Sequence, residues 1–163
     1  MRLRPVEEVR RAGETPVDYV RRLAQAKAEA AWDNADEIVL GADTTVVVAG
    51  DQVLEKPADA DGARAMLRLL SSREHAVITG ICLLHAGGRI LDHSATQVRF
   101  AALTESEIAD YVASGEPFDK AGGYAIQGLA SKFVEGVNGC YFNVMGLPLS
   151  LVYRHWKRLT AAE

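Results

Sequence analysis

Three polar side chains stand where the sequence pattern would normally place apolar or ordinary loop residues. Lys27 falls on the apolar stripe of a helix, three residues after Ala24. Asp43 directly follows the apolar run 38–42, and Lys56 is held in a restricted backbone region by the proline after it. Two ammonium groups and a carboxylate can bind a polyphosphate, and the carboxylate can hold a divalent cation or accept a proton.

Each of these residues also has an ordinary structural interpretation. A lysine on a helix stripe can extend its ammonium group to the rim, so Lys27 is either a surface cation or a fixed cation in a cleft. Asp43 either caps a turn through Thr44 and Thr45 or presents its carboxylate at a strand end, where α/β sheets bind ligands. Lys56 by itself is typical of a solvated loop. The residues alone leave these alternatives open.

The segment 119–128 combines charges, glycines and an amide without a helix or strand period. Asp119 and Lys120 begin it, and Gln127 lies near its end. Glycines allow close approach of the backbone to a ligand, and successive N–H groups can bind an anion. The alternative is a tight structural loop with an ion pair between Asp119 and Lys120. The density of unusual residues favours a functional segment.

Other motifs that carry chemistry are absent from the sequence. It contains no P-loop, dinucleotide fingerprint, nucleophile elbow or HExxH motif. The four histidines lack metal-ligand spacing, which argues against zinc. Cys82 and Cys140 lie outside any CxxC spacing, which predicts buried free thiols in a reducing compartment.

Length and composition predict one folded domain spanning residues 1–163. The chain is 48% hydrophobic and 25% charged, values that exclude wholesale disorder. A net charge of -4 gives no basic surface for nucleic acid or an anionic membrane. Residues 1–11 carry no apolar signal region, and no apolar run is long enough to span a bilayer, so we expect a cytoplasmic protein.

The order of the expected elements indicates an α/β fold. Helices are expected where capping residues precede an apolar stripe, at about 15–32, 59–70, 104–115 and 148–156. Strands are expected in the β-branched and alternating segments 38–42, 45–49, 52–54, 75–85, 89–100, 133–137 and 141–144. Gly87-Gly88 predicts an antiparallel hairpin, and Asn138-Gly139 a second one. We therefore expect a mixed sheet flanked by helices.

The same positions give the chain a resemblance to the Maf family of nucleotide pyrophosphatases. The resemblance follows the chain in order over nearly its whole length, and the ordered series is more specific than any single segment. The matching segments are Arg22-Leu23-Ala24 with Lys27-Ala28, Gly41-Ala42-Asp43-Thr44-Thr45-Val46, Leu54-Glu55-Lys56-Pro57, Thr79-Gly80, Ser114-Gly115-Glu116-Pro117, 119–128, and Asn143 with Gly146-Leu147-Pro148-Leu149.

This resemblance implies a fold and a set of site residues. The fold is an elongated mixed sheet with helices and two lobes around a central cleft, similar to that of the inosine triphosphate pyrophosphatases. The resemblance implies that Asp43 is the proton acceptor and that Lys27 and Lys56 are lysines of the cleft. The residues implied to select or bind the substrate are Thr44, Gln127, Asp119 and Lys120. Glu8 is implied as an upstream acid that shares a metal with Asp43.

The resemblance also implies an activity. It indicates hydrolysis of dTTP and UTP to the monophosphate and pyrophosphate, with Mg²⁺ or Mn²⁺ as cofactor, in housecleaning of the nucleotide pool. The nucleoside triphosphate is the expected partner, with a homodimer as a further possibility. The alternatives are a catalytically impaired nucleotide-binding regulator and a purine-type enzyme acting on ITP or XTP. A non-catalytic interaction module is the weakest alternative because it leaves 119–128 unexplained.

One feature departs from the family pattern. Family members begin with a strand and a loop of the form S-x-S-P-R-R, whereas this chain starts at Met1-Arg2-Leu3-Arg4-Pro5. The resemblance therefore implies either a start site assigned too far downstream or a truncated form. In both cases a polyphosphate would lose part of its arginine and serine clamp.

Overall fold

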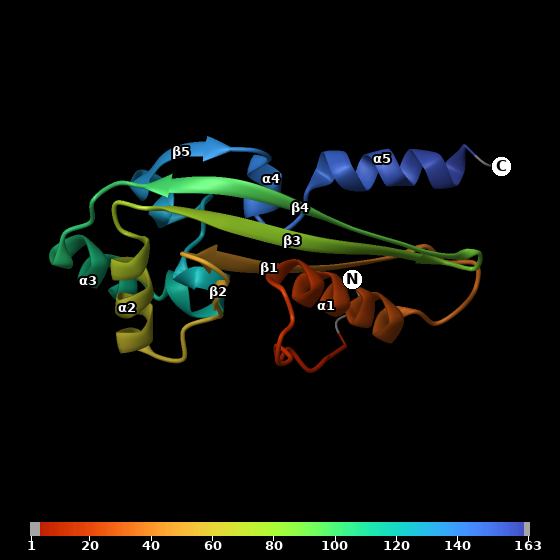
Figure 1. Cartoon of the computed structure of the whole chain (residues 1–163), viewed down its shortest axis with the longest axis horizontal. Helices are drawn as coiled ribbons and strands as arrows, with labels where there is room; N and C mark the ends of the chain where they lie inside the picture. Colours follow the sequence, from red (N-terminus) through yellow and green to blue (C-terminus); the bar gives the residue numbers. More distant parts are fainter. Residues whose placement is uncertain (1–3, 162–163) are drawn as a thin grey trace.

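A computed structural model describes residues 4–161 as an elongated α/β structure built on one long sheet (Figure 1). The sheet has five strands in the order β2-β1-β3-β4-β5. The strands are β1 (Val39–Val48), β2 (Gln52–Leu54), β3 (Glu74–His85), β4 (Gly88–Phe100) and β5 (Val134–Asn138). The α/β class and the elongated shape confirm the expectation from sequence.

The sheet differs from the expected mixed arrangement because all its strand pairings within residues 4–161 are antiparallel. β1 runs antiparallel to both β2 and β3, and β3 runs antiparallel to β4. β2 pairs with β1 only at Val46–Val48. Within the described residues, the outer edge of β1 from 39 to 45 therefore has no strand partner.

Three of the α-helices in the described residues begin at the capping residues that the sequence predicted. Thr15, Asp59 and Thr104 each accept a hydrogen bond from a backbone N–H of the first turn, and Thr104 forms the full capping box with Glu107. The helices are α1 (Pro16–Ala31), α2 (Ala60–Leu70), α3 (Glu105–Ala113), α4 (Tyr141–Val144) and α5 (Leu149–Thr160). Short 3₁₀ turns η1 (Glu116–Asp119), η2 (Ala121–Gly123) and η3 (Leu129–Phe133) connect α3 to β5.

α1 lies directly against one face of the sheet, and two glycines make this close approach possible. A Cβ atom on Gly41 of β1 would lie 2.1 Å from the carbonyl oxygen of Ala24, and one on Gly80 of β3 would lie 2.4 Å from that of Val20. Both positions therefore require glycine for the observed helix–sheet distance. The backbone of α1 is thus placed against β1, where the polar residues of interest lie.

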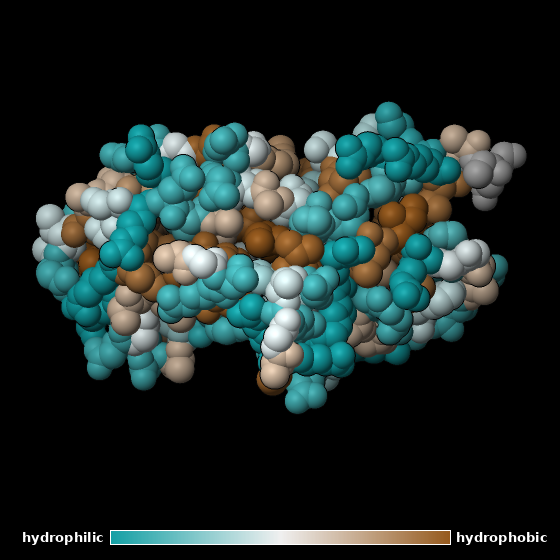
Figure 2. Space-filling view, viewed as in Figure 1, coloured by the Kyte–Doolittle hydropathy of each residue, from teal (hydrophilic) through white to brown (hydrophobic). Residues whose placement is uncertain are grey.

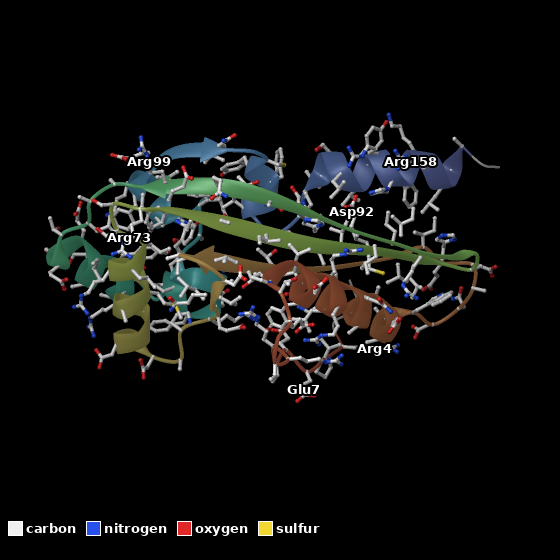
Figure 3. All side chains as sticks on the ribbon, in the orientation of Figure 1. Arg4, Glu7, Arg73, Asp92, Arg99 and Arg158 are labelled. Carbon is white, nitrogen blue, oxygen red and sulfur yellow. The ribbon has the colours of Figure 1, made fainter. Side chains whose placement is uncertain are left out.

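The opposite face is covered in two parts. At one end of the sheet, α2, α3 and the 3₁₀ turns enclose a core that includes Leu67, Phe100, Tyr111 and Phe133. At the other end, α5 lies over β4 (Figure 1). Figure 3 shows Asp92 of β4 beneath α5, where its Oδ2 lies 2.7 Å from Nε2 of the buried His155.

Two local expectations were wrong. Segment 141–144 forms the short helix α4 rather than a strand, so β5 pairs with β4 and has no hairpin partner in 141–144. Asp43 does not end a strand, because β1 continues through it and Asp43 pairs with Gly80 of β3. Its neighbouring apolar runs, 38–42 and 45–49, belong to one strand.

The described residues contain no helix that is both long and apolar enough to cross a bilayer. Cys82 and Cys140 are free thiols, as predicted; Cys82 is buried, whereas Cys140 is partly exposed. Burial raises the pKa of the Cys82 thiol to about 11, which keeps it protonated near neutral pH.

The core contains one titratable group whose effect on stability can be measured. His75 is 2% exposed, and burial lowers its pKa from 6.5 to about 4. Between these two values only the unfolded chain binds the proton, so the fold loses about 2–3 kcal/mol as the pH falls from 7.5 to 4.5. We expect His75→Gln to lose correspondingly less stability over that range in urea unfolding. An equal loss in both proteins would contradict this assignment.

Candidate active site

A polar cavity lies at the open edge of β1, between α1 and the loop that follows β2. Its volume is about 200 Å³. It is lined by Glu8, Tyr19, Leu23, Lys27, Ala42, Asp43, Thr44, Glu55, Lys56 and Ala121. The two lysines and the aspartate singled out from the sequence therefore meet in one place.

Lys27 is the centre of this cavity's charge network. Its Nζ lies 2.6 Å from Asp43 Oδ1 and 2.6 Å from Glu8 Oε1. The Lys56 Nζ lies 3.8 Å from the other Glu8 oxygen, so the Glu8 carboxylate stands between two ammonium groups. Lys27 is thus a fixed cation in the cavity, and its side chain is 30% exposed. Lys56 is 58% exposed and keeps more of the character of a loop lysine.

The two carboxylates that share Lys27 differ in basicity. Burial raises the pKa of Asp43, and this outweighs the opposing effect of the Lys27 ammonium. The hydrogen bond from Lys27 lowers the pKa of the more exposed Glu8. Burial disfavours the charged form of Lys27, but its hydrogen bonds to both acids outweigh this and raise its pKa. Asp43 is therefore the carboxylate better suited to accept a proton.

Tyr19 and Glu55 extend the network, and sequence analysis did not assign them to the site. The Tyr19 hydroxyl lies 3.1 Å from Glu55 Oε1 and 3.1 Å from the carbonyl oxygen of Glu8. It thereby ties the N-terminal segment to α1. Tyr19 lies eight residues before Lys27 on the same side of the helix. A tyrosine on a buried helix face needs a hydrogen-bond partner for its hydroxyl, and this requirement could have indicated that Tyr19 belongs to the site.

A second, smaller cavity lies beside the first, on the other side of Thr44. Its volume is about 110 Å³. The lining residues are Thr44, Val46, Val77, Asp119, Lys120, Ala121, Tyr124, Val144, Met145 and Gly146. Thr44, Asp119 and Lys120 are thus brought to this cavity, and Thr44 borders both. Gln127 is exposed and lies outside both sets of lining residues, so its role in reading a base stays a prediction.

The segment 119–128 does not form the anion-binding nest that its glycines suggested. The N–H of Gly122 donates to the Glu55 carbonyl oxygen, and the N–H of Gly123 donates to that of Lys120. These donors are already used by the backbone. Lys120 and Asp119 form the expected ion pair at 2.6 Å. The glycines serve packing instead, because a Cβ on Gly122 would lie 2.7 Å from Val46 Cγ2.

A larger cavity of about 1040 Å³ continues along the open edge of β1. It shares Glu8, Lys27 and Ala42 with the polar cavity and is bordered on its other side by 145–147. Figure 2 shows apolar residues along the middle of this face, between the polar surfaces of the α1 side and the α5 side. Arg4, labelled in Figure 3, lines this cavity and pairs with Asp33. The polar cavity therefore opens into a space large enough for an extended ligand.

The acids present fit a divalent cation only when the ligand completes its coordination. Among residues 4–161, no three His, Cys, Asp or Glu side chains converge as a metal cluster. Asp43 and Glu8 supply two carboxylates on either side of one ammonium group. Mg²⁺ commonly binds one or two carboxylates together with phosphate oxygens and water, so this donor set suits it.

The close packing of α1 on β1 can be tested through Gly41. We expect Gly41→Ala to destabilise the protein by about 1–3 kcal/mol or more, because the added methyl group overlaps the backbone of α1. The displacement should also move Lys27 away from Asp43. Gly136→Ala is the matched control, since a Cβ there would meet no atom within 4 Å. Equal unfolding midpoints in urea for the two variants would contradict the close approach.

Fold and site together describe an α/β protein with a polar cleft at an open sheet edge, lined by two lysines and three carboxylates. The chain belongs to the Maf family: the family model described as "Maf-like protein" matches residues 2–159. This confirms the resemblance inferred from its motifs.

Curated relatives that are named for an activity are similar over most of the chain. A "dTTP/UTP pyrophosphatase" of Koribacter versatilis is 49% identical over 154 residues, which cover 94% of this chain and 79% of the relative. The protein of the same name from Hahella chejuensis is 51% identical over 148 residues, covering 88% and 73%. That of a Geobacillus species is 51% identical over 146 residues, covering 89% and 78%.

Proposed function

We propose that this chain is a nucleoside triphosphate pyrophosphatase that hydrolyses dTTP and UTP to the monophosphate and pyrophosphate. The observation that carries the proposal is the meeting of Lys27, Lys56 and Asp43 in one cavity. The relatives named above share about half of their aligned residues with this chain, and their names support the same substrates. The reaction would serve the nucleotide pool of the cytoplasm.

Asp43 is the proposed proton acceptor. It takes a proton from the water that attacks the α-phosphorus, and the raised pKa that burial gives it favours this role. A new P–O bond forms to the water oxygen, the bond to the β-phosphate oxygen breaks, and pyrophosphate leaves. Lys27 and Lys56 offset the negative charge that develops on the phosphoryl oxygens.

Glu8 and Asp43 are the residues that would hold Mg²⁺ or Mn²⁺ together with the triphosphate. The ion, when bound, would supply a positive charge that polarises the phosphoryl oxygens. The triphosphate would take the place of Glu8 between the ammonium groups of Lys27 and Lys56. The same carboxylate would then be available to the ion.

The two cavities suggest how the nucleotide is oriented. The polar cavity with its lysines suits phosphate, whereas the smaller cavity joins Thr44 to apolar side chains such as Val46 and Val144 and suits a base. Both share Thr44 and Ala121, so one ligand can extend from one to the other. Asp119 and Lys120 would then lie near the base or the sugar.

A screen of pyrophosphate release tests this function. Phosphate is measured with malachite green after added inorganic pyrophosphatase, using dTTP, UTP, CTP, ITP and XTP with Mg²⁺, Mn²⁺ or a chelator. Metal-dependent release from dTTP and UTP is expected. Preference for ITP or XTP would instead identify a purine-type enzyme. Binding of UTP without release of pyrophosphate would identify a nucleotide-binding regulator. The same screen should be run on a chain extended by the S-x-S-P-R-R segment.

A second copy of the chain is a further proposed partner. α5 exposes three large apolar side chains at helical spacing on one face: Leu149, Tyr153 and Trp156. Light scattering at several concentrations would show a dimer that Tyr153→Glu weakens, and a monomer at every concentration would contradict this proposal.

A further inference from the structure

Three residues form a short hydrogen-bonded chain that ends at the wall between the two cavities. Thr44 Oγ1 lies 2.8 Å from Thr79 Oγ1, and Thr79 Oγ1 lies 3.0 Å from the main-chain carbonyl oxygen of Asn143. Thr79 and Asn143 are completely buried. Thr44 is partly exposed and lines both cavities.

The number of hydroxyl protons fixes which group donates in each of these two hydrogen bonds. A carbonyl oxygen has no proton, so the contact between Thr79 and Asn143 must use the hydroxyl proton of Thr79. Thr79 then has no proton for Thr44, and the 2.8 Å contact must use the proton of Thr44. The reverse direction would leave two acceptor oxygens 3.0 Å apart with no proton between them. Thr44 therefore donates to Thr79, and Thr79 donates to Asn143.

The acceptor at the end of the chain is held in place by its own side chain. Asn143 Nδ2 donates to the Val77 carbonyl oxygen at 2.9 Å and to Thr96 Oγ1 at 3.0 Å. These bonds attach α4 to β3 and β4. The Asn143 carbonyl oxygen also accepts from the N–H of Gly146. The acceptor is thus rigid, and the direction of the hydroxyl chain does not depend on mobile groups.

Thr44 presents only lone pairs to a ligand as a result. Its single proton points to Thr79 inside the sheet, so its remaining capacity is that of an acceptor. Space beside the hydroxyl is kept open by Gly146, which has a φ of +105° and whose missing Cβ would lie 3.5 Å from Thr44 Oγ1. A ligand atom next to Thr44 must therefore be a donor to gain a hydrogen bond.

We propose that Thr79 is a positioning residue that makes Thr44 an acceptor and so selects bases with a protonated ring nitrogen. Uracil and thymine carry one N–H on their pairing edge, at N3, whereas N3 of cytosine has no proton and repels an acceptor. The amine of cytosine lies at another ring position, so the base would have to shift to use it. This inference rests on the proposed function, since it assigns the smaller cavity to the base of the same nucleotide.

Binding measurements test this selection without requiring turnover. Calorimetry with Mg²⁺ and the α,β-imido analogues of UTP, CTP and pyrimidin-2-one ribonucleoside triphosphate, whose N3 carries no proton and whose position 4 carries only hydrogen, gives the affinities. The wild type should bind the UTP analogue about 10-fold or more tightly than either of the others, the effect expected of one hydrogen bond and an avoided repulsion. Thr79→Val frees the Thr44 proton and should reduce this ratio to about 3-fold or less. Thr79→Ser keeps the hydroxyl and should retain the wild-type ratio.

The ratio separates a directing role from a merely structural one. A variant that only loosens the fold would weaken all three analogues together, and urea unfolding of each variant reports such a loss. An unchanged ratio in Thr79→Val, or equal binding of all three analogues by the wild type, overturns the inference even where pyrophosphate is released from UTP. Absence of pyrophosphate release with the expected ratios overturns the proposed catalysis and leaves the base selection standing as a property of nucleotide binding.

Discussion

Asp43→Asn is expected to lower the rate of pyrophosphate release by about 10³-fold or more. The amide is close to the carboxylate in size and can still accept the hydrogen bond from Lys27, so the fold should be unchanged. It can neither accept the proton of the attacking water nor carry the charge that binds a cation. The measurement is turnover of UTP with Mg²⁺, with the unfolding midpoint in urea as a check on stability.

Asp51→Asn is the matched control for this variant. Asp51 is an exposed carboxylate at the turn between β1 and β2, outside the polar cavity. The same chemical change there should leave turnover within about 2-fold of wild type, as surface substitutions away from a site usually do. Wild-type turnover by Asp43→Asn would refute the assignment of Asp43 as proton acceptor.

Removal of the central ammonium group should have the next largest effect. We expect Lys27→Met to reduce kcat/KM for UTP by about 10²–10³-fold. The variant loses the cation proposed to neutralise phosphate oxygens, and it leaves the carboxylates of Asp43 and Glu8 without their shared partner. Both kcat and KM should suffer, because the proposed mechanism places this ammonium against the substrate before and during the reaction.

Lys132→Met controls for the loss of one positive charge. Lys132 is exposed on η3, beside the ring of Phe133, and outside both cavities. Its kinetics should match those of wild type. If the Lys132 and Lys27 variants show the same kcat/KM, the polar cavity does not bind the triphosphate.

Much of the secondary structure could be predicted because its signals are local. Thr15, Asp59 and Thr104 mark helix starts through hydrogen bonds made within one turn. Segment 141–144 was predicted wrongly as a strand after the Asn138-Gly139 turn. Its helix is fixed by tertiary contacts, chiefly those of the Asn143 amide with β3 and β4, which no local pattern reveals.

The charged part of the site was predictable, and its surroundings were not. Lys27 stood out because a charged residue on a buried stripe needs a partner, and its partners are Asp43 and Glu8. The position of the cavity depends on where β2 stops pairing with β1, a long-range property of the sheet. Thr79 lies in an expected strand and in a segment that matches the family, but the sequence does not reveal the direction of its hydroxyl proton. That direction follows only from the distance to a carbonyl oxygen 64 residues away.

A crystal structure with the α,β-imido analogue of UTP and Mg²⁺ would test the central claim most directly. We predict phosphate oxygens within hydrogen-bonding distance of the Lys27 and Lys56 ammonium groups, with Glu8 displaced from between them and uracil N3 facing Thr44. Phosphates bound elsewhere, for instance in the groove lined by Arg11, Arg21 and Arg22 on the outer side of α1, would contradict the account.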